Sequence, residues 1–130
     1  MEIDNNGDMW RDFTYVENLV RGVRLLVDAV PVRLESAAVM PTGDRLAAAP
    51  FRVVNIGNSH KVGLMDFVEA IKAEHGKPDI KHVWHMQKGY VPATWADASL
   101  LQALTGFWPQ TDVREGVRSF VAWCREYYDV

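Results

Sequence analysis

"FRVVNIGNSHKVGLMDFVEAIKAEHGKP", residues 51–78, is the stretch that decides the fold class. Its beginning, 51–57, is a short apolar run that ends at a glycine followed by polar residues, which is typical of a strand. The pattern then changes to helical spacing over 64–75, with apolar residues at Leu64, Phe67, Val68 and Ile71. Gly63 is an acceptable N-cap, and Gly76 closely followed by a proline is a stop signal. A strand followed by a helix favours an α/β fold.

The rest of the chain adds more helices than strands. We expect further helices at 15–29, between Asp97 as cap and Gly106, and after Thr111, and a further strand at 80–87. Asp4 is assigned to another short strand. Residues 32–50 show no period and contain two prolines, which predicts a surface loop. The prediction is a single α/β domain over 1–130, with a small few-stranded sheet and about four helices, and so small a sheet needs a covering partner.

The composition argues against several classes of function. Hydrophobic residues make up 48% of the 130 residues and the net charge is -3, so a basic nucleic-acid-binding face is not expected. The single cysteine excludes an internal disulfide and a cysteine metal cluster. No apolar run approaches the roughly 18 residues of a membrane span, and the acidic N-terminus is unlike a secretory signal. We therefore expect a cytoplasmic protein with no membrane and no nucleic-acid partner.

No complete catalytic or metal site is visible in the sequence. The glycines are spaced too widely for a dinucleotide-binding motif or a P-loop. His82 and His85 are three apart on a predicted strand, so they should point to opposite faces and not share a metal. Cys124 lies on the apolar face of the last helix, which favours a core position over a nucleophile. We therefore predict no catalytic residue and no metal ligand.

Two stretches are less ordinary. Arg11 precedes a helix, and its planar guanidinium could clamp a phosphate; a solvated side chain or a salt bridge to Asp12 or Glu17 are the alternatives. In "KGYVPATWAD", residues 88–97, the proline fixes a turn, and we expect Trp95 to pack under the helix that follows.

Three segments make the chain recognisable: "RDFTYVENLVRGV" at 11–23, "FRVVNIGNSHKVGLMDFVEAI" at 51–71 and "MQKGYVPATWADASLLQALTGFWPQTDVREGVRSFVAWCREYY" at 86–128. In order and spacing they resemble the nucleotide-sugar epimerases, NAD-dependent enzymes of the extended short-chain dehydrogenase/reductase superfamily, and among them most the UDP-glucuronate 4-epimerase group. The resemblance covers essentially the whole chain, but only the C-terminal, substrate-binding part of such an enzyme. The family's Rossmann domain, with its GxxGxxG loop for NAD and its Tyr-x-x-x-Lys pair, has no counterpart in this sequence.

The resemblance implies roles for individual residues. Arg11 matches an arginine that reaches the nucleotide diphosphate or its ribose, and Gln87, Lys88 and Tyr90 match the loop that lines the nucleotide. Where this chain has Tyr90, the family usually has an aspartate that is thought to bind the uridine ribose, and Asp4 stands where the family tends to have an aromatic residue. Losing a charge-assisted hydrogen bond costs about 1.5–3 kcal/mol, which is about tenfold to a hundredfold in affinity.

The function implied by the resemblance is that of a C-terminal, nucleotide-sugar-binding portion of a UDP-glucuronate-type 4-epimerase. Without the NAD loop and the catalytic pair, the chain alone is expected to be inactive and to hold no cofactor, whereas NAD is the cofactor of the full-length family. The alternative is a non-catalytic remnant that binds a nucleotide sugar weakly, or binds only protein. The expected partners are a UDP-sugar and either a second copy of the chain or the missing N-terminal Rossmann domain.

Overall fold

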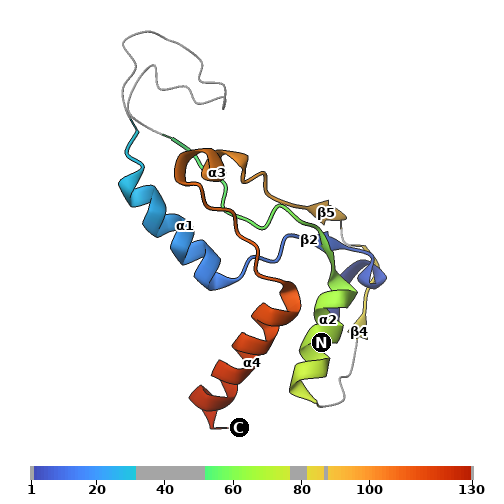
Figure 1. Cartoon of the computed structure of the whole chain (residues 1–130). Helices are drawn as coiled ribbons and strands as arrows, with labels where there is room; N and C mark the ends of the chain where they lie inside the picture. The colour runs from blue at the N-terminus through green and yellow to red at the C-terminus, as the bar shows by residue number, and fades with distance from the viewer. Residues whose placement is uncertain (1, 32–51, 77–81, 87, 130) are drawn as a thin grey trace.

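The computed structural model describes residues 2–31, 52–76, 82–86 and 88–129 of the chain (Figure 1). Within these residues the elements follow in the order β1 (Glu2–Ile3), the 3-10 helix η1 (Asp4–Gly7), β2 (Trp10–Arg11), α1 (Val16–Asp28), β3 (Val62–Gly63), α2 (Leu64–His75), β4 (His82–Val83), β5 (Ala93–Thr94), α3 (Ser99–Thr105) and α4 (Val113–Tyr128). α1, α2 and α3 begin and end within one or two residues of the predicted spans, and α4 begins two residues after Thr111, as expected. None of the described helices has the length and the apolar character that a membrane crossing needs.

α2 and α4 pack side by side and form one half of the hydrophobic core (Figure 1). Ala70 of α2 is buried against Val117 and Val121 of α4, which are four residues apart and therefore lie on one side of their helix. Phe67 extends this cluster, and its ring stacks on the ring of Phe13 with the centroids 4.1 Å apart. This stacking fastens the chain that leads into α1 onto the α2–α4 pair.

The other half of the core lies between α1, α3 and the extended segment 52–56. Ala98 and Leu101, at the start of α3, are fully buried. The partly buried residues that pack on them come from α1 and from the segment: Leu25, Leu26, Val54 and Ile56. α1 approaches the segment so closely that a Cβ at Gly22 would lie 3.1 Å from Ile56 Cγ2. A larger residue at this position would push the helix away from the core.

The strands form two very small sheets. β1 pairs in parallel with β4, while β2 is the middle strand of the other sheet, antiparallel to β3 and parallel to β5. In register, Trp10 lies between Gly63 and Ala93, and Arg11 lies between Val62 and Thr94. Helices around a few-stranded mixed sheet are the α/β arrangement that the sequence predicted.

The predicted strand 51–57 is wrong over the residues that the structure describes. Along 52–56 the side chains do alternate, with Val54 and Ile56 partly buried and Val53 and Asn55 exposed. No strand of the described residues pairs with this segment, because its neighbours on the core side are α1 and α3. Alternation predicts an extended backbone, but a strand also needs a neighbouring backbone with which to form hydrogen bonds.

Three smaller expectations fare differently. Of the predicted strand 80–87 the structure describes 82–86, of which His82–Val83 form β4 and 84–86 lie outside a strand. Asp4 does not lie in a strand but begins η1, a tight turn in which Asn5 and Asn6 both have positive φ. The predicted loop 32–50 lies outside the described residues.

The helix ends agree with the sequence signals in part, since Gly63 is the N-cap of α2 as predicted, whereas the N-cap of α3 is Ala98 and not the predicted Asp97. Gly76 and Gly106 end α2 and α3 in the left-handed conformation, where glycine has no Cβ penalty. The carboxylate of Asp97 accepts a hydrogen bond from Ser99 N–H at 2.9 Å. Hydrogen bonds from the Ser99 side chain and amide lower the pKa of the Asp97 carboxyl below its ordinary value. Its stabilising effect is therefore present above its unfolded-state pKa and is lost in acid, as the pH falls through the folded-state pKa.

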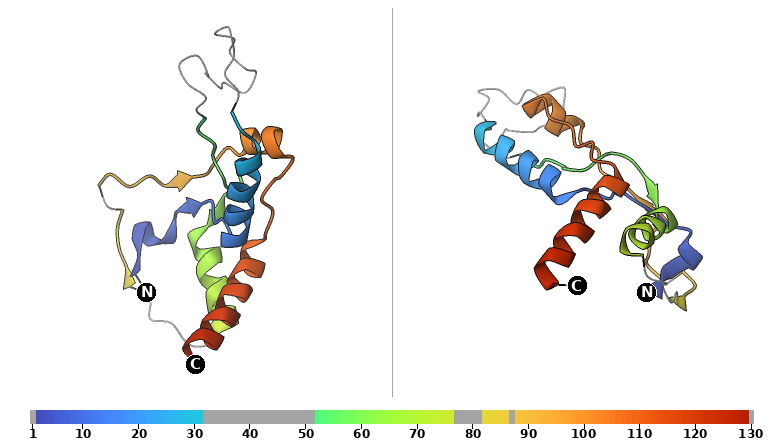
Figure 2. Two further views of the ribbon diagram at one scale, coloured as in Figure 1. Left: turned by 90° about the vertical axis from the view of Figure 1, so that its left-hand side faces the viewer. Right: turned by 60° about the horizontal axis from the view of Figure 1, so that its bottom comes forward.

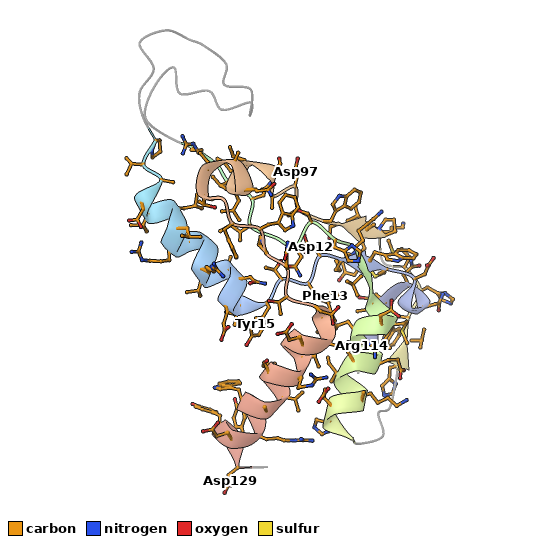
Figure 3. All side chains as sticks on the ribbon, viewed as in Figure 1. Asp12, Phe13, Tyr15, Asp97, Arg114 and Asp129 are labelled. Carbon is orange, nitrogen blue, oxygen red and sulfur yellow. The ribbon has the colours of Figure 1, made fainter. Side chains whose placement is uncertain are left out.

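The carboxylate of Asp12, between β2 and α1, binds the backbone of two other segments (Figure 3). Oδ1 accepts from Asn58 N–H at 3.0 Å, and Oδ2 accepts from Ser59 N–H at 3.0 Å and from Ala96 N–H at 3.1 Å. Ser59 has a φ of 56°, which is unfavourable for a residue other than glycine, so its bond to the carboxylate helps to hold a strained turn. A Cβ at Gly57 would lie 2.7 Å from Oδ2, so this position needs glycine.

Replacing Asp12 with asparagine should destabilise the fold by about 2–3 kcal/mol, because an amide group would face three backbone donors that now share two charged oxygens. Urea unfolding followed by circular dichroism measures the change. Asp8→Asn is the matched control, since the exposed Asp8 side chain makes no hydrogen bond within the described residues. Equal midpoints for the two variants would show that the Asp12 bonds do not hold the fold.

Candidate functional site

Arg11 lies on the middle strand of the β3-β2-β5 sheet, and its guanidinium reaches the chain that enters β5. Nη1 donates hydrogen bonds to the carbonyl oxygens of Trp10 at 2.7 Å and Pro92 at 3.3 Å, and Nη2 donates to Val91 O at 3.1 Å. The predicted salt-bridge alternatives are wrong, because no acidic side chain of the described residues pairs with this arginine. The side chain instead fastens β2 to the loop before β5.

The loop that Arg11 holds carries two of the other predicted site residues. Gly89 turns the chain with a φ of 92°, a left-handed conformation that favours glycine. On either side of it, Lys88 and Tyr90 are exposed, and neither side chain makes a hydrogen bond within the described residues. Gln87 lies outside the described residues. The structure thus joins Arg11 to the chain directly after Lys88 and Tyr90, at Val91 and Pro92.

Arg11 keeps donors that the fold does not use. A guanidinium has five N–H groups, and the three hydrogen bonds to backbone carbonyls occupy three of them. Because these bonds fix the orientation of the planar group, less side-chain freedom is lost when a ligand binds. A partly exposed guanidinium with unused donors is suited to the oxygens of a phosphate or a carboxylate.

The opposite face of the same sheet is aromatic. Because successive strand residues alternate, the Trp10 side chain points away from the side of the sheet that carries Arg11. Trp95 follows β5, and Lys61 Nζ lies 4.3 Å from the centroid of its ring. Trp95 is 55% exposed, so the prediction that it packs under α3 is wrong. The buried side of α3 is filled from α1, and the turn before α3 is held by the hydrogen bond of Ala96 N–H to Asp12. The sequence analysis missed this role of Asp12.

Other polar residues do not assemble into a metal site. Among the described residues, no group of three histidine, cysteine, aspartate or glutamate side chains could hold a metal ion. His82 and His85 are both exposed, the first in β4 and the second three residues further on. Cys124 is only partly buried on α4, so the expectation of a core position is met in part.

The residues present do not fit a dinucleotide cofactor. A dinucleotide pyrophosphate binds where closely spaced glycines open a helix N-terminus to it. At the start of α2 the Cβ position of Gly63 lies 2.8 Å from Asp66 Oδ2, so an acidic side chain covers this N-terminus and would repel a phosphate. Nowhere in the sequence do two glycines stand three residues apart, and no tyrosine has a lysine four positions later. The sequence therefore holds neither the glycine motif that cradles a dinucleotide pyrophosphate nor the Tyr-x-x-x-Lys pair.

Several known proteins similar to this chain are named as UDP-glucuronate 4-epimerases. The chain is 43% identical over 129 residues to a Rhizobium meliloti protein named "Probable UDP-glucuronate 4-epimerase" and 41% identical over 130 residues to Protein CapI of Staphylococcus aureus. Both matches cover 98% of this chain but only 38% of the relative. No protein-family model matches the chain.

Solved structures show the same relation. The structure of MoeE5 in complex with UDP-glucuronic acid and NAD is 28% identical and superposes with a TM-score of 0.73, over 98% of this chain and 37% of MoeE5. In sequence and in fold, the chain corresponds to the C-terminal part of NAD-dependent nucleotide-sugar epimerases of the extended short-chain dehydrogenase/reductase type. Within that class it is similar to UDP-glucuronate 4-epimerases, which confirms the resemblance seen in the sequence.

Removing the Arg11 side chain should loosen the junction of β2 with β5. The amides of Trp10 and Asp12 donate to Pro92 O and Thr94 O, and in Arg11→Ala we expect their hydrogen exchange to be about tenfold faster. Exchange followed by NMR measures this, with Arg114→Ala as a control at an exposed arginine. Unchanged exchange in Arg11→Ala would mean that the three carbonyl bonds do not hold the loop.

Proposed function

We propose that the chain is the nucleotide-sugar-binding portion of a UDP-glucuronate-type 4-epimerase. The observation that carries the proposal is the position of Arg11, whose guanidinium is fixed against the loop of Lys88 and Tyr90 and still has unused donors. Planar, bidentate donors suit the diphosphate of a UDP-sugar, and in the proposal the adjacent loop contacts the nucleoside. MoeE5 supports the substrate class, because its structure holds UDP-glucuronic acid.

The chemistry of such an enzyme requires groups that this chain does not have. Epimerisation at a sugar carbon through NAD needs a cofactor site and a group that moves a proton. The sequence contains neither a GxxGxxG loop nor a Tyr-x-x-x-Lys pair. In the proposal this chain therefore binds and orients the nucleotide end of the substrate, while a nucleotide-binding portion supplies the cofactor and the catalytic pair.

A second candidate function is a non-catalytic module that binds a nucleotide sugar weakly or binds only protein. Tyr90 favours it, since an exposed tyrosine stands where the family usually has a ribose-binding aspartate. A phenol hydroxyl is a weaker acceptor than a carboxylate, so affinity for the nucleoside is reduced unless Lys88 compensates. The two functions differ in whether a nucleotide-binding portion acts together with this chain.

The chain by itself should not interconvert UDP-glucuronate and its 4-epimer. The purified chain is incubated with UDP-glucuronate and NAD, and the sugars are separated by chromatography. We expect no product above the level of the buffer, because the proton-transfer pair is missing. Product that increases in proportion to the amount of chain would contradict the assignment of catalysis to another portion.

Binding of UDP should depend on the two residues in opposite ways. In Arg11→Ala we expect a loss of about tenfold to a hundredfold in affinity, and in Tyr90→Asp a gain in the same range, because each change removes or adds one charge-assisted hydrogen bond. Titration followed by NMR measures both, with Arg114→Ala and Tyr128→Asp as matched controls at exposed positions. If UDP binds and Arg11→Ala has no effect, the diphosphate is held elsewhere.

A further inference from the structure

The side of the β3-β2-β5 sheet that lies opposite Arg11 carries two exposed indole rings. Trp10 is 40% exposed and Trp95 is 55% exposed. In the parallel register Trp10 lies beside Ala93, and Trp95 is two residues further along the chain, so both side chains leave the sheet on the same side. We call this side of the sheet, with its two tryptophans, the indole face.

The residues next to Trp10 are too small to cover its ring. Its partners in register are Gly63 on one side and Ala93 on the other. A Cβ at Gly63 would lie 3.9 Å from Trp10 Nε1, so the indole rests beside a position that has no side chain. β2 and β5 also extend beyond the helices on one side of the molecule (Figure 2, left). The outer surface of the Trp10 indole is therefore open to a ligand.

Polar groups with unused hydrogen-bonding capacity border the indole face. Asp66 Oδ2 lies 2.8 Å from the same Cβ position at Gly63, which places this carboxylate near the Trp10 indole. At the other tryptophan, Lys61 Nζ lies 4.3 Å from the centroid of the Trp95 ring. Within the described residues, the Asp66 carboxylate, the Lys61 ammonium and the Trp10 indole N–H make no hydrogen bond or ion pair. The face thus offers one acceptor group and two donor groups that the fold does not use.

The two charges on this face select against charged ligands. Asp66 repels a phosphate or a carboxylate, and Lys61, which already lies over the Trp95 ring, repels a cation. A neutral ligand with many hydroxyl groups suits both charges, because a hydroxyl donates to a carboxylate and accepts from an ammonium or an indole N–H. The apolar C–H surface of a pyranose ring also packs well on an indole. A saccharide is therefore the class of ligand that uses both the rings and the polar groups.

We propose that the indole face binds a neutral saccharide of two or more units, with sugar rings on Trp10 and Trp95. Asp66 accepts a hydrogen bond from one hydroxyl, and Lys61 donates a hydrogen bond to another. The spacings of a sheet place the Cα atoms of the two tryptophans roughly 8 Å apart, which is more than one pyranose ring covers. This site goes beyond the proposed function, because it lies on the opposite side of β2 from Arg11 and takes no part in holding a nucleotide.

Two other occupants of the indole face are disfavoured by its charge and its size. A nucleoside also stacks on tryptophan, but the phosphates of a nucleotide would approach the Asp66 carboxylate. A second copy of the chain would need more surface, because a stable dimer buries about 800 Å² on each partner. Two tryptophan side chains have about 150–250 Å² each and are here only about half exposed. A small neutral ligand fits the area that is present.

The first experiment follows the indole N–H signals of the chain by NMR during titration with cellotetraose and with maltotetraose. The signals of the five tryptophans are assigned from single tryptophan-to-phenylalanine variants. We expect the Trp10 and Trp95 signals to shift with a Kd on the order of 1 mM, since an open face buries little of its ligand. The signal of Trp123, an exposed indole on α4, should stay in place. Unmoved Trp10 and Trp95 signals at about ten times this concentration of both sugars would overturn the proposal.

The second experiment separates stacking from hydrogen bonding with two substitutions. In Trp95→Ala we expect a loss of about tenfold in saccharide affinity, because one of the two rings is removed. In Asp66→Asn we expect a loss of about threefold to tenfold, because an amide oxygen is a weaker acceptor than a carboxylate. Trp123→Ala and Glu115→Gln are the matched controls, and all four positions are exposed, so the fold should change little. Equal saccharide affinity of Trp95→Ala and the unchanged chain would contradict the proposal.

Control titrations test the other occupants and the independence of the two sites. If uridine shifts the Trp10 and Trp95 signals and the oligosaccharides do not, the face binds a nucleobase and the proposal is wrong. Signals that shift with the concentration of the chain alone would assign the face to a second copy instead. UDP should leave both indole signals in place, because its proposed site is on the Arg11 side. Saccharide binding without UDP binding would reject the proposed function and leave the saccharide site standing.

Discussion

The fold depends on one carboxylate that gathers three parts of the chain. Asp12 stands between β2 and α1, and its two oxygens accept amide hydrogens from the turn at 58–59 and from Ala96, just before α3. These segments are 46 to 84 positions away in the sequence, so the bonds close long loops at a single point. The carboxylate leaves no space for a Cβ at position 57, which is a glycine. It also bonds to the amide of Ser59, a residue with positive φ.

The geometry of the candidate site also depends on the chain around Asp12. Arg11 is the last residue of β2 and Asp12 follows it directly, and in an extended backbone successive side chains point in opposite directions. The carboxylate fixes the chain that leads to α3, and the guanidinium fixes the loop that enters β5, so both side chains act on the same stretch from 91 to 96. Two adjacent charged residues thus hold neighbouring parts of one stretch of backbone. In this arrangement the Arg11 guanidinium has a fixed orientation, is partly exposed and has N–H groups that no protein acceptor uses.

Helices were predicted well from this sequence because their signals are local. Apolar spacing located α1, α2 and α4, and Gly76 and Gly106 marked two of the helix ends, since both signals act within a few residues of the backbone they describe. The candidate site came from the resemblance, and the structure added the hydrogen bonds that join Arg11 to its loop. Asp12 was missed because its partners are distant in sequence, and Trp95 was misplaced because nothing local distinguishes a buried tryptophan from one that stacks under a lysine.

The most informative error is the strand expected at 51–57. The alternation of Val54 and Ile56 is real, yet the described chain offers no backbone for the segment to pair with. The apolar spacing of α1 likewise predicted the helix correctly, but several of its apolar side chains are exposed in the described chain. A hydrophobic pattern records what is buried in the complete assembly, and it does not depend on how much of that assembly is present. In both elements the local pattern is correct about the backbone conformation, and what it cannot predict is which surface of the described chain lies opposite.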